Sequence, residues 1–321
     1  MLTYDSPRRT DCAAIVCGGS LMTKAHRRTA AAPSDRITRT LALTNQSGGA
    51  GKTTSAVNIG ACVADLGYTA LVIDADAQCD ASAALGYDNP DSDPNQATLY
   101  DVLTGAAKLQ DAVVPAMAGP AGEEGTKTIP NLFVALGSSN LEEAEQLLAP
   151  KTGREFWLRT QLDKVRDTYD LILIDCPGNL GLIVVNAIVA ADDVVACVKP
   201  GWKELRALTR MESKIDDIRE TFTAMGASAE LANILIVDCP TTRNQGAIYD
   251  DSQQQAKETY EELVLPTVRR SPRIPEAYAA QQVLRYYDPV TENPSKLTPT
   301  SAMSATDDYY LVAQALGFTR R

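Results

Sequence analysis

The chain has 321 residues, of which 45% are hydrophobic and 22% are charged, proportions that exclude a fibrous repeat and a globally disordered chain. This length is sufficient to bury one large core or two smaller ones. The formal net charge of −11 excludes a protein that binds nucleic acid through an overall positive charge, so any DNA contact must come from a local basic surface.

The first 38 residues differ in charge from the rest of the chain. Through residue 40 the chain has seven basic and three acidic side chains, and the segment Thr29–Ser34 has the alanine, proline and serine content of a linker. We predict a basic, disordered leader at 1–38 and a single domain at 39–321. A DNA-contacting arm and a non-native start upstream of the initiation codon are the alternatives for the leader.

Short apolar runs alternate with helix-length segments from Thr40 onward. A helix is expected at Thr53–Leu66 between two strands, which makes a βαβ unit. Surface loops are expected at Asp88–Gln96 and Ala116–Pro130, which are rich in turn-forming residues. The expected strands are Thr40–Thr44, Ala70–Ile73, Leu132–Leu136, Leu171–Ile174, Val194–Val198 and Ile234–Val237. The pattern predicts an α/β fold, with a doubly wound, mostly parallel sheet and helices on both faces.

A glycine-rich loop lies between the first expected strand and the first expected helix. In such a turn the backbone N–H groups converge on phosphate oxygens, and the helix N-terminus adds its positive dipole. The spacing places the Lys52 amine on the β and γ phosphates and the Thr53 hydroxyl on Mg²⁺. The candidate phosphate-binding residues are Ser47, Gly48, Gly49, Ala50, Gly51, Lys52, Thr53 and Thr54. This motif predicts a P-loop nucleoside triphosphatase.

The loop and two later motifs resemble those of the ParA/MinD family of deviant Walker A ATPases. The run Asp74–Gln78 is similar to the family's D-x-D-P-Q switch, and Asp175-Cys176-Pro177 is similar to the end of its Walker B strand. The similarity covers about residues 40 to 318 and is greatest to the Soj-like partition branch. The resemblance implies ATP and Mg²⁺ as cofactors, an ATP-bound homodimer that binds DNA non-specifically, and a ParB-like adaptor that stimulates a slow ATPase.

One position departs from that family pattern. Most members have a signature lysine at the place of Ser47, and that lysine reaches the partner's phosphates across the dimer. Serine cannot supply this charge, although carboxysome-positioning members of the McdA type also have serine there. Lys199 or Lys203, after the expected strand Val194–Val198, is our candidate for the compensating cation. Two solvated surface lysines are the alternative.

Acidic residues and a base site complete the expected nucleotide site. Asp76 follows a strand end, where a carboxylate can orient the attacking water. Asp175 ends a buried strand and can hold Mg²⁺ through water, with Asp74 in support. Helix capping is the alternative role for all three. By resemblance, Asp238 and Pro240 lie where the family contacts its base, and the absence of a guanine-reading motif favours adenine.

A second candidate surface is basic. The segment Pro266–Arg285 has four arginines and one acidic residue, Glu276, a local balance of +3. Arginine clusters pair with DNA phosphates without reading sequence. By resemblance, we expect DNA contacts from Arg243, Arg270 and Arg273. The alternative is that the arginines pair with the chain's many carboxylates.

The last segment and the apolar runs bear on membrane binding. Asp307–Arg321 is apolar but begins with two aspartates and has few basic residues, so we predict a core-packing helix rather than the basic membrane helix that ends MinD relatives. The longest apolar stretch, Leu182–Ala191, is too short to cross a bilayer.

These observations lead to one expected function and several alternatives. We expect a cytoplasmic, nucleoid-associated ParA-type ATPase that segregates a plasmid, a chromosome or another cargo. A membrane-associated MinD-like regulator and a nucleotide-binding scaffold with negligible turnover are the alternatives. The seven cysteines include no Cys-x-x-Cys pair, which argues against an iron–sulfur carrier and predicts buried, reduced thiols.

Overall fold

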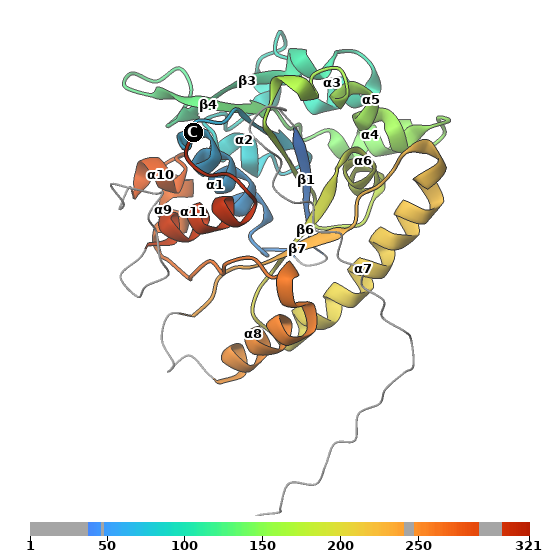
Figure 1. Ribbon diagram of the computed structural model, residues 1–321. Helices are drawn as coiled ribbons and strands as arrows, with labels where there is room; N and C mark the ends of the chain where they lie inside the picture. The colour runs from blue at the N-terminus through green and yellow to red at the C-terminus, as the bar shows by residue number, and fades with distance from the viewer. Residues whose placement is uncertain (1–37, 46–47, 241–246, 289–303) are drawn as a thin grey trace, which may run out of the picture. The chain divides into compact units, whose positions relative to one another are not determined.

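The computed structural model describes residues 38–45, 48–240, 247–288 and 304–321 (Figure 1). The leader expected at 1–38 lies outside this part of the chain except for its last residue. Thr38 is buried, and its hydroxyl lies 2.7 Å from the carbonyl oxygens of both Arg166 and Tyr169. The folded domain therefore includes one residue that we assigned to the leader.

A seven-stranded sheet forms the centre of the described residues, in the order β3-β4-β2-β5-β1-β6-β7. Its strands are β1 (Arg39–Thr44), β2 (Ala70–Asp74), β3 (Val113–Ala118), β4 (Lys127–Ala135), β5 (Leu171–Asp175), β6 (Asp193–Val198) and β7 (Leu231–Ile236). Neighbouring strands are parallel, except that β3 is antiparallel to β4. The expected mostly parallel sheet is confirmed.

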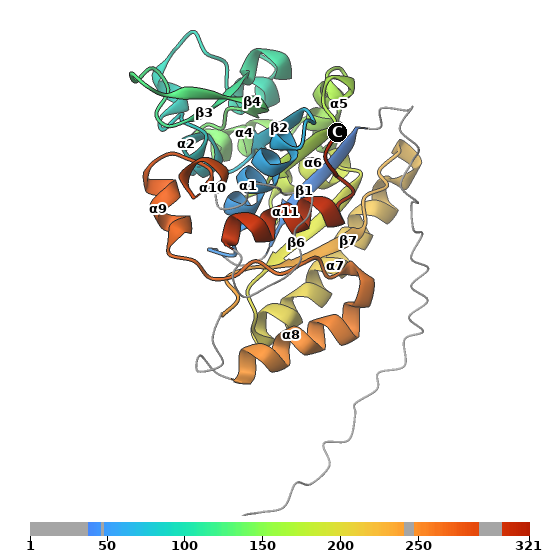
Figure 2. The ribbon, with the colours of Figure 1, turned by 60° about the vertical axis from the view of Figure 1, so that its left-hand side comes forward.

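Helices cover both faces of the sheet (Figure 2). They are α1 (Lys52–Asp65), α2 (Asp80–Ala84), α3 (Leu99–Thr104), α4 (Leu141–Leu148), α5 (Trp157–Leu162), α6 (Leu182–Ala190), α7 (Trp202–Phe222), α8 (Ala247–Tyr260), α9 (Arg273–Ala279), α10 (Leu284–Tyr287) and α11 (Ala305–Ala315). Along β1, Leu41 and Leu43 pack with α1 and α11, whereas Ala42 packs with α6 and α7. Because strand side chains alternate between faces, each face supports its own apolar core, and the doubly wound arrangement is confirmed.

The expected loop at Ala116–Pro130 is largely a β-hairpin. Strands β3 and β4 occupy about half of it, and the connection is 119–126. The strand pattern is weak because β3 is a half-exposed edge strand with a register shift between Pro115 and Met117, and β4 contains Pro130. Proline usually argues against a strand interior, so the sequence analysis missed β3 and the first half of β4, although it expected the end of β4 as the strand Leu132–Leu136.

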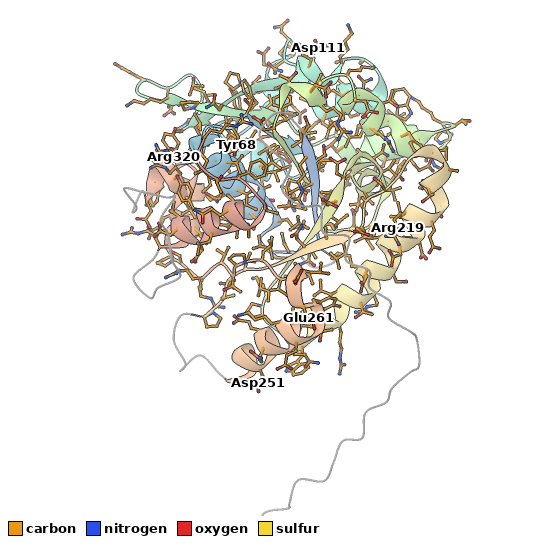
Figure 3. The ribbon with its side chains drawn as sticks, viewed as in Figure 1. Tyr68, Asp111, Arg219, Asp251, Glu261 and Arg320 are labelled. Carbon is orange, nitrogen blue, oxygen red and sulfur yellow. The ribbon has the colours of Figure 1, made fainter. Side chains whose placement is uncertain are left out.

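The last helix, α11, packs into the core as expected. Tyr309 and Tyr310 are each 1% exposed, and the Tyr310 hydroxyl donates a hydrogen bond to Asp65 at the end of α1. After α11, the Arg321 guanidinium lies 4.0 Å from the centre of the Tyr68 ring. Figure 3 labels Tyr68 and Arg320, the residue before Arg321. None of the described helices combines the length and apolarity needed to cross a bilayer.

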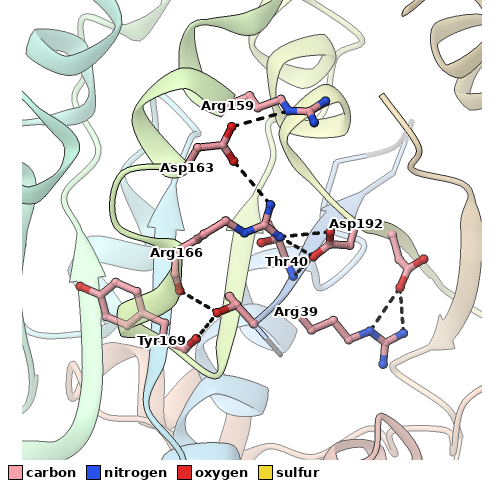
Figure 4. Close-up of polar contacts among 9 residues, drawn as sticks. Arg39, Thr40, Arg159, Asp163, Arg166, Tyr169 and Asp192 are labelled. Atoms are coloured by element: carbon pink, nitrogen blue, oxygen red, sulfur yellow. Dashed lines mark hydrogen bonds and ion pairs between the residues drawn. The ribbon is translucent and has the colours of Figure 1, made fainter. Parts of the chain in front are cut away.

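Polar contacts fix the start of β1 (Figure 4). The Asp192 carboxylate accepts hydrogen bonds from the backbone N–H of Thr40, at 2.8 Å, and from the Arg166 guanidinium, at 3.0 and 3.1 Å. Arg39 pairs with Asp193 at 3.1 Å. These half-buried pairs join the first residues of β1 to the start of β6, at the edge of the sheet opposite its carboxyl ends.

Candidate nucleotide-binding site

A cleft of about 420 Å³ lies at the carboxyl ends of three adjacent strands. The glycine-rich loop follows β1, a second loop with Asp76 follows β2, and a third loop, 176–181, follows β5. These strands are neighbours in the order β2-β5-β1, so their loops meet, as they do where parallel α/β sheets bind ligands. The lining includes all of Gly48–Thr54, Ala75–Gln78, Asp80, Glu142, Glu145 and Pro177–Asn179.

The glycine-rich loop has the backbone that a phosphate cradle requires. Gly49 and Gly51 have φ values of 68° and 74°, a left-handed conformation that other residues adopt with strain. A Cβ at Gly51 would also lie 2.9 Å from a methyl of Val237, so this glycine is needed for space as well. Gly51 immediately precedes α1, whose first residue is the nearly buried Lys52. The candidate Ser47 lies outside the described residues.

Asp175 fits a magnesium ligand. Its carboxylate is fully buried, and neither oxygen makes a hydrogen bond of normal geometry within the described residues. Burial raises its pKa well above the usual value, the Asp74 charge raises it further, and the nearby Thr53 hydroxyl and Lys52 ammonium lower it. A buried carboxylate with unsatisfied oxygens beside a hydroxyl is the hard oxygen donor set that Mg²⁺ prefers.

The Asp74 carboxylate has a structural role in the fold. One of its carboxylate oxygens accepts hydrogen bonds from the Ser82 N–H at 2.7 Å and the Ser82 hydroxyl at 2.6 Å. Burial raises its pKa to about 6, partly offset by these bonds. A Cβ at Gly137 would lie 2.8 Å from its carboxyl carbon. Asp74 stands beside Asp175 in register, so it can support a metal there while it anchors α2.

Asp76 is exposed to the cleft, unlike its neighbour Asp74. It is half-buried and lines the cleft, and one carboxylate oxygen accepts the Gln78 N–H at 3.1 Å. The loop turns through Cys79, a residue other than glycine with φ of 56°. This partly free carboxylate next to the phosphate loop is placed to contact a water molecule in the cleft.

Lys199, Asp238 and Pro240 are absent from the described residues that line the cleft. The Asp238 carboxylate accepts hydrogen bonds from Arg270 at 2.7 and 3.2 Å and lies 3.6 Å from the Lys199 amine. Lys199 is thus engaged beside the cleft rather than in it. A role at phosphates would require a second copy of the chain.

The basic segment Pro266–Arg285 is locally neutralised in three dimensions. The pairs are Arg269 with Asp308, Arg270 with Asp238, Arg273 with Glu276 and Arg285 with Asp65. The balance of +3 counted along the sequence is therefore wrong for the folded surface, because three of the partners come from distant segments. The Arg270 and Arg273 side chains remain about half exposed, at 48% and 54%, and Arg243 lies outside the described residues.

Helix α7 has a basic stripe, of which the sequence analysis singled out only the candidate compensating cation Lys203. Lys203, Arg206, Arg210 and Lys214 are all exposed, and none forms an ion pair within the described residues. Spacings of three and four residues place them on one side of the helix. The spacing of these basic residues at helical periods was visible in the sequence. A count of charges along the segment did not reveal the stripe, because acidic residues alternate with the basic ones on the same helix. We call these four residues the α7 stripe.

The described cysteines fit the expectation of buried thiols. Cys62, Cys79, Cys176, Cys197 and Cys239 are all free and buried. Burial raises the pKa of each thiol, so the reactive thiolate is disfavoured. Cys12 and Cys17 lie outside the described residues.

Comparison with known proteins identifies relatives. Residues 38–228 match a family model described as an AAA domain. The sporulation initiation inhibitor protein Soj of Bacillus subtilis is 30% identical over 78% of this chain and 91% of its own length. The chromosome partitioning protein ParA of Caulobacter vibrioides is 37% identical over 56% of this chain and 63% of its own. A structure of cobyrinic acid a,c-diamide synthase from Mycobacterium smegmatis, with a bound ATP analogue and magnesium, is 26% identical with a TM-score of 0.62, and the match covers 78% of this chain and 96% of that one.

Proposed function

The chain belongs to the ParA/MinD-type family of P-loop ATPases, and from that membership we propose that it is a partition or positioning ATPase that binds and hydrolyses ATP with Mg²⁺ in the cleft described above. The observation that carries this proposal is that Lys52, Thr53 and Asp76 line one cleft and all lie close enough to the buried, unsatisfied carboxylate of Asp175 to shift its pKa. The cleft has one side for phosphates and metal and one for a water nucleophile.

Each residue has a role that follows from its place. The loop N–H groups from Gly48 to Thr54 bind the phosphate oxygens, and Lys52 neutralises charge on the β and γ phosphates. Thr53 and Asp175 would hold Mg²⁺, with Asp74 in support, and the bound ion would supply further charge neutralisation. Asp76 orients the attacking water, because phosphoryl transfer depends chiefly on positioning.

We further propose that an ATP-bound homodimer binds DNA without sequence preference. The supporting surfaces are the half-exposed Arg270 and Arg273, with Arg243, and the α7 stripe. A single chain of net charge −11 has little free positive surface, so it binds DNA weakly. Two chains brought together by ATP double that surface, which makes DNA binding depend on the nucleotide.

The proposed function also involves a second chain, the adenine base and an adaptor protein. Lys199 acts on the phosphates of the second chain in place of the lysine that Ser47 replaces. Asp238 and Pro240 contact the adenine base. A ParB-like adaptor stimulates the slow hydrolysis and releases the dimer from the nucleoid in the cytoplasm. The domain at 39–321 carries these activities, and the leader adds positive charge.

The test is DNA co-sedimentation without nucleotide and with ADP, ATP or a slowly hydrolysed ATP analogue. We expect DNA binding with ATP and the analogue only, and we expect Lys52→Ala to abolish it because the variant cannot bind the phosphates. A matched measurement of ATP hydrolysis identifies a variant that binds but does not turn over. DNA binding that ignores the nucleotide, or no DNA binding in any state, would overturn the partition proposal.

A further inference from the structure

We infer that Glu145 is a positioning residue for ATP hydrolysis, because its carboxylate holds the loop 176–181 and the start of α6 in place over the phosphate site. The inference rests on the proposed ATPase activity. Glu145 lies on α4, outside the three sequence motifs that point to the nucleotide site.

Two contacts connect Glu145 to the loop. Its Oε1 accepts a hydrogen bond from the Ile183 N–H at 2.8 Å. Ile183 is the second residue of α6, and such first-turn N–H groups have no partner within their own helix. A carboxylate at this end of a helix also interacts favourably with the helix dipole. Glu145 therefore caps α6 from another element.

The loop approaches the Glu145 carboxylate so closely at Gly181 that a side chain there would displace the carboxylate. A Cβ at Gly181 would overlap Glu145 Oε1 and lie 2.9 Å from Oε2. Gly181 has a φ of −79°, which any residue can adopt, so a larger residue here would be opposed not by backbone conformation but by the Glu145 carboxylate, which would have to move away. The carboxylate thus fixes both the end of the loop and the first turn of the helix.

The held loop forms one wall of the phosphate site. It begins directly after Asp175, and Pro177, Gly178 and Asn179 line the cleft. A Cβ at Gly178 would lie 3.9 Å from the Lys52 amine, so the loop backbone runs beside that ammonium group. A loop that drifts away from Lys52 would open this wall of the phosphate site to water.

Helix α4 is a firm support for this contact. Leu141, Ala144 and Leu148 are all buried in the core, so the helix cannot move without disturbing it. Glu145 is half-buried, whereas Glu143 on the same helix is exposed and is not part of the cleft lining. Glu143 is therefore a matched control that differs from Glu145 in position but not in chemistry.

The test compares Glu145→Ala, Glu145→Gln and Glu143→Ala by steady-state ATP hydrolysis and by thermal unfolding. We expect Glu145→Ala to lower kcat by about tenfold or more and to change KM much less. A misplaced catalytic loop slows the reaction more than it weakens substrate binding. The glutamine amide oxygen can accept the same hydrogen bond, so Glu145→Gln should restore most of the rate. Glu143→Ala should behave like the wild type.

Hydrogen exchange of the Ile183 amide gives a readout that does not depend on turnover. We expect fast exchange in Glu145→Ala and protection in the wild type and Glu145→Gln, with β1 protected in all three. Wild-type kcat in Glu145→Ala, or no rescue by glutamine, would overturn the positioning role. An unprotected Ile183 amide in the wild type would overturn the contact itself. A wild-type protein that binds ATP, protects Ile183 and never hydrolyses ATP would contradict the proposed ATPase instead.

Discussion

Two aspartates that are two residues apart have different environments. Asp74 is fully buried and bonded to Ser82, whereas Asp76 is half-buried and lines the cleft. The sequence motif Asp74–Gln78 contains both aspartates and does not distinguish their roles. The structure separates a side chain that shapes the loop from one that is available to a water molecule.

We therefore expect Asp76→Asn to lower kcat by about a hundredfold, because the amide is a poor substitute for a carboxylate that orients and polarises water. ATP affinity and the unfolding temperature should stay close to those of the wild type, since Asp76 makes one exposed hydrogen bond. Rapid-quench hydrolysis and binding of a fluorescent ATP analogue measure the two quantities. Asp88→Asn, a change in an exposed carboxylate outside the cleft lining, is the control. Equal rates in both variants would remove Asp76 from the mechanism.

Residues close together in the sequence were the predictable part of the site. The run from Gly48 to Thr54 is contiguous, so its chemistry could be read directly. Glu145 joins the site from a separate helix, and Asp238 pairs with Arg270 across 32 residues. Such contacts depend on how the sheet brings distant segments together, and no local pattern in one sequence encodes them.

At the scale of elements, strands buried on both faces were the easiest to predict. The continuous apolar runs of β1, β2, β5 and β6 carry a strong signal, and the structure confirms each within about two residues. Strand β3 and the first half of β4 gave no such signal, since most of their side chains are exposed or half exposed and prolines interrupt both strands, whereas the apolar end of β4 was expected as the strand Leu132–Leu136. Helix α11 was predictable as a core helix because its charge is wrong for a membrane surface.

The packing of α11 leads to a prediction about stability. Tyr309 on α11 is buried in the core that α11 shares with α1 and the sheet, so Tyr309→Ala should lower the free energy of unfolding by about 3 kcal/mol or more, the usual cost of deleting a buried aromatic ring. Tyr286→Ala, at a side chain 39% exposed on α10, should cost much less. Urea unfolding at equilibrium measures both. An unchanged midpoint for Tyr309→Ala, together with sedimentation of the wild type on anionic vesicles, would contradict the core assignment and favour a membrane role.

At the scale of the whole molecule, most of the arginines in the described residues form ion pairs with carboxylates. Four arginines of the segment Pro266–Arg285 have carboxylate partners, and two of those arginines are about half exposed. The α7 stripe has no such partners within the described residues. Exposed ion pairs are weak, so DNA phosphates can compete for Arg270 and Arg273, but unpaired cations bind phosphates without that competition.

We therefore expect the double variant of Arg206→Ala and Arg210→Ala to weaken DNA binding more than the double variant of Arg270→Ala and Arg273→Ala. The slope of log affinity against log salt should fall by about one for each DNA phosphate that the variant no longer binds, counted over both chains of the dimer. Binding titrations at several salt concentrations give these slopes. Arg219→Ala removes a paired arginine from the far end of α7 and should leave the slope unchanged. The reverse order of effects would place the DNA on α9.

The position of β1 in the sheet has a consequence for protein synthesis. It is the first of the described strands to be made, yet both of its neighbours, β5 and β6, are encoded far downstream. Its first partner follows about 130 residues later, which at ordinary translation rates takes roughly 7 to 26 s. During that time an apolar segment that ends buried at five of its six positions has nothing to pair with. Strand β1, an inner strand of the finished sheet, is thus the stretch of nascent chain with the most to gain from a chaperone.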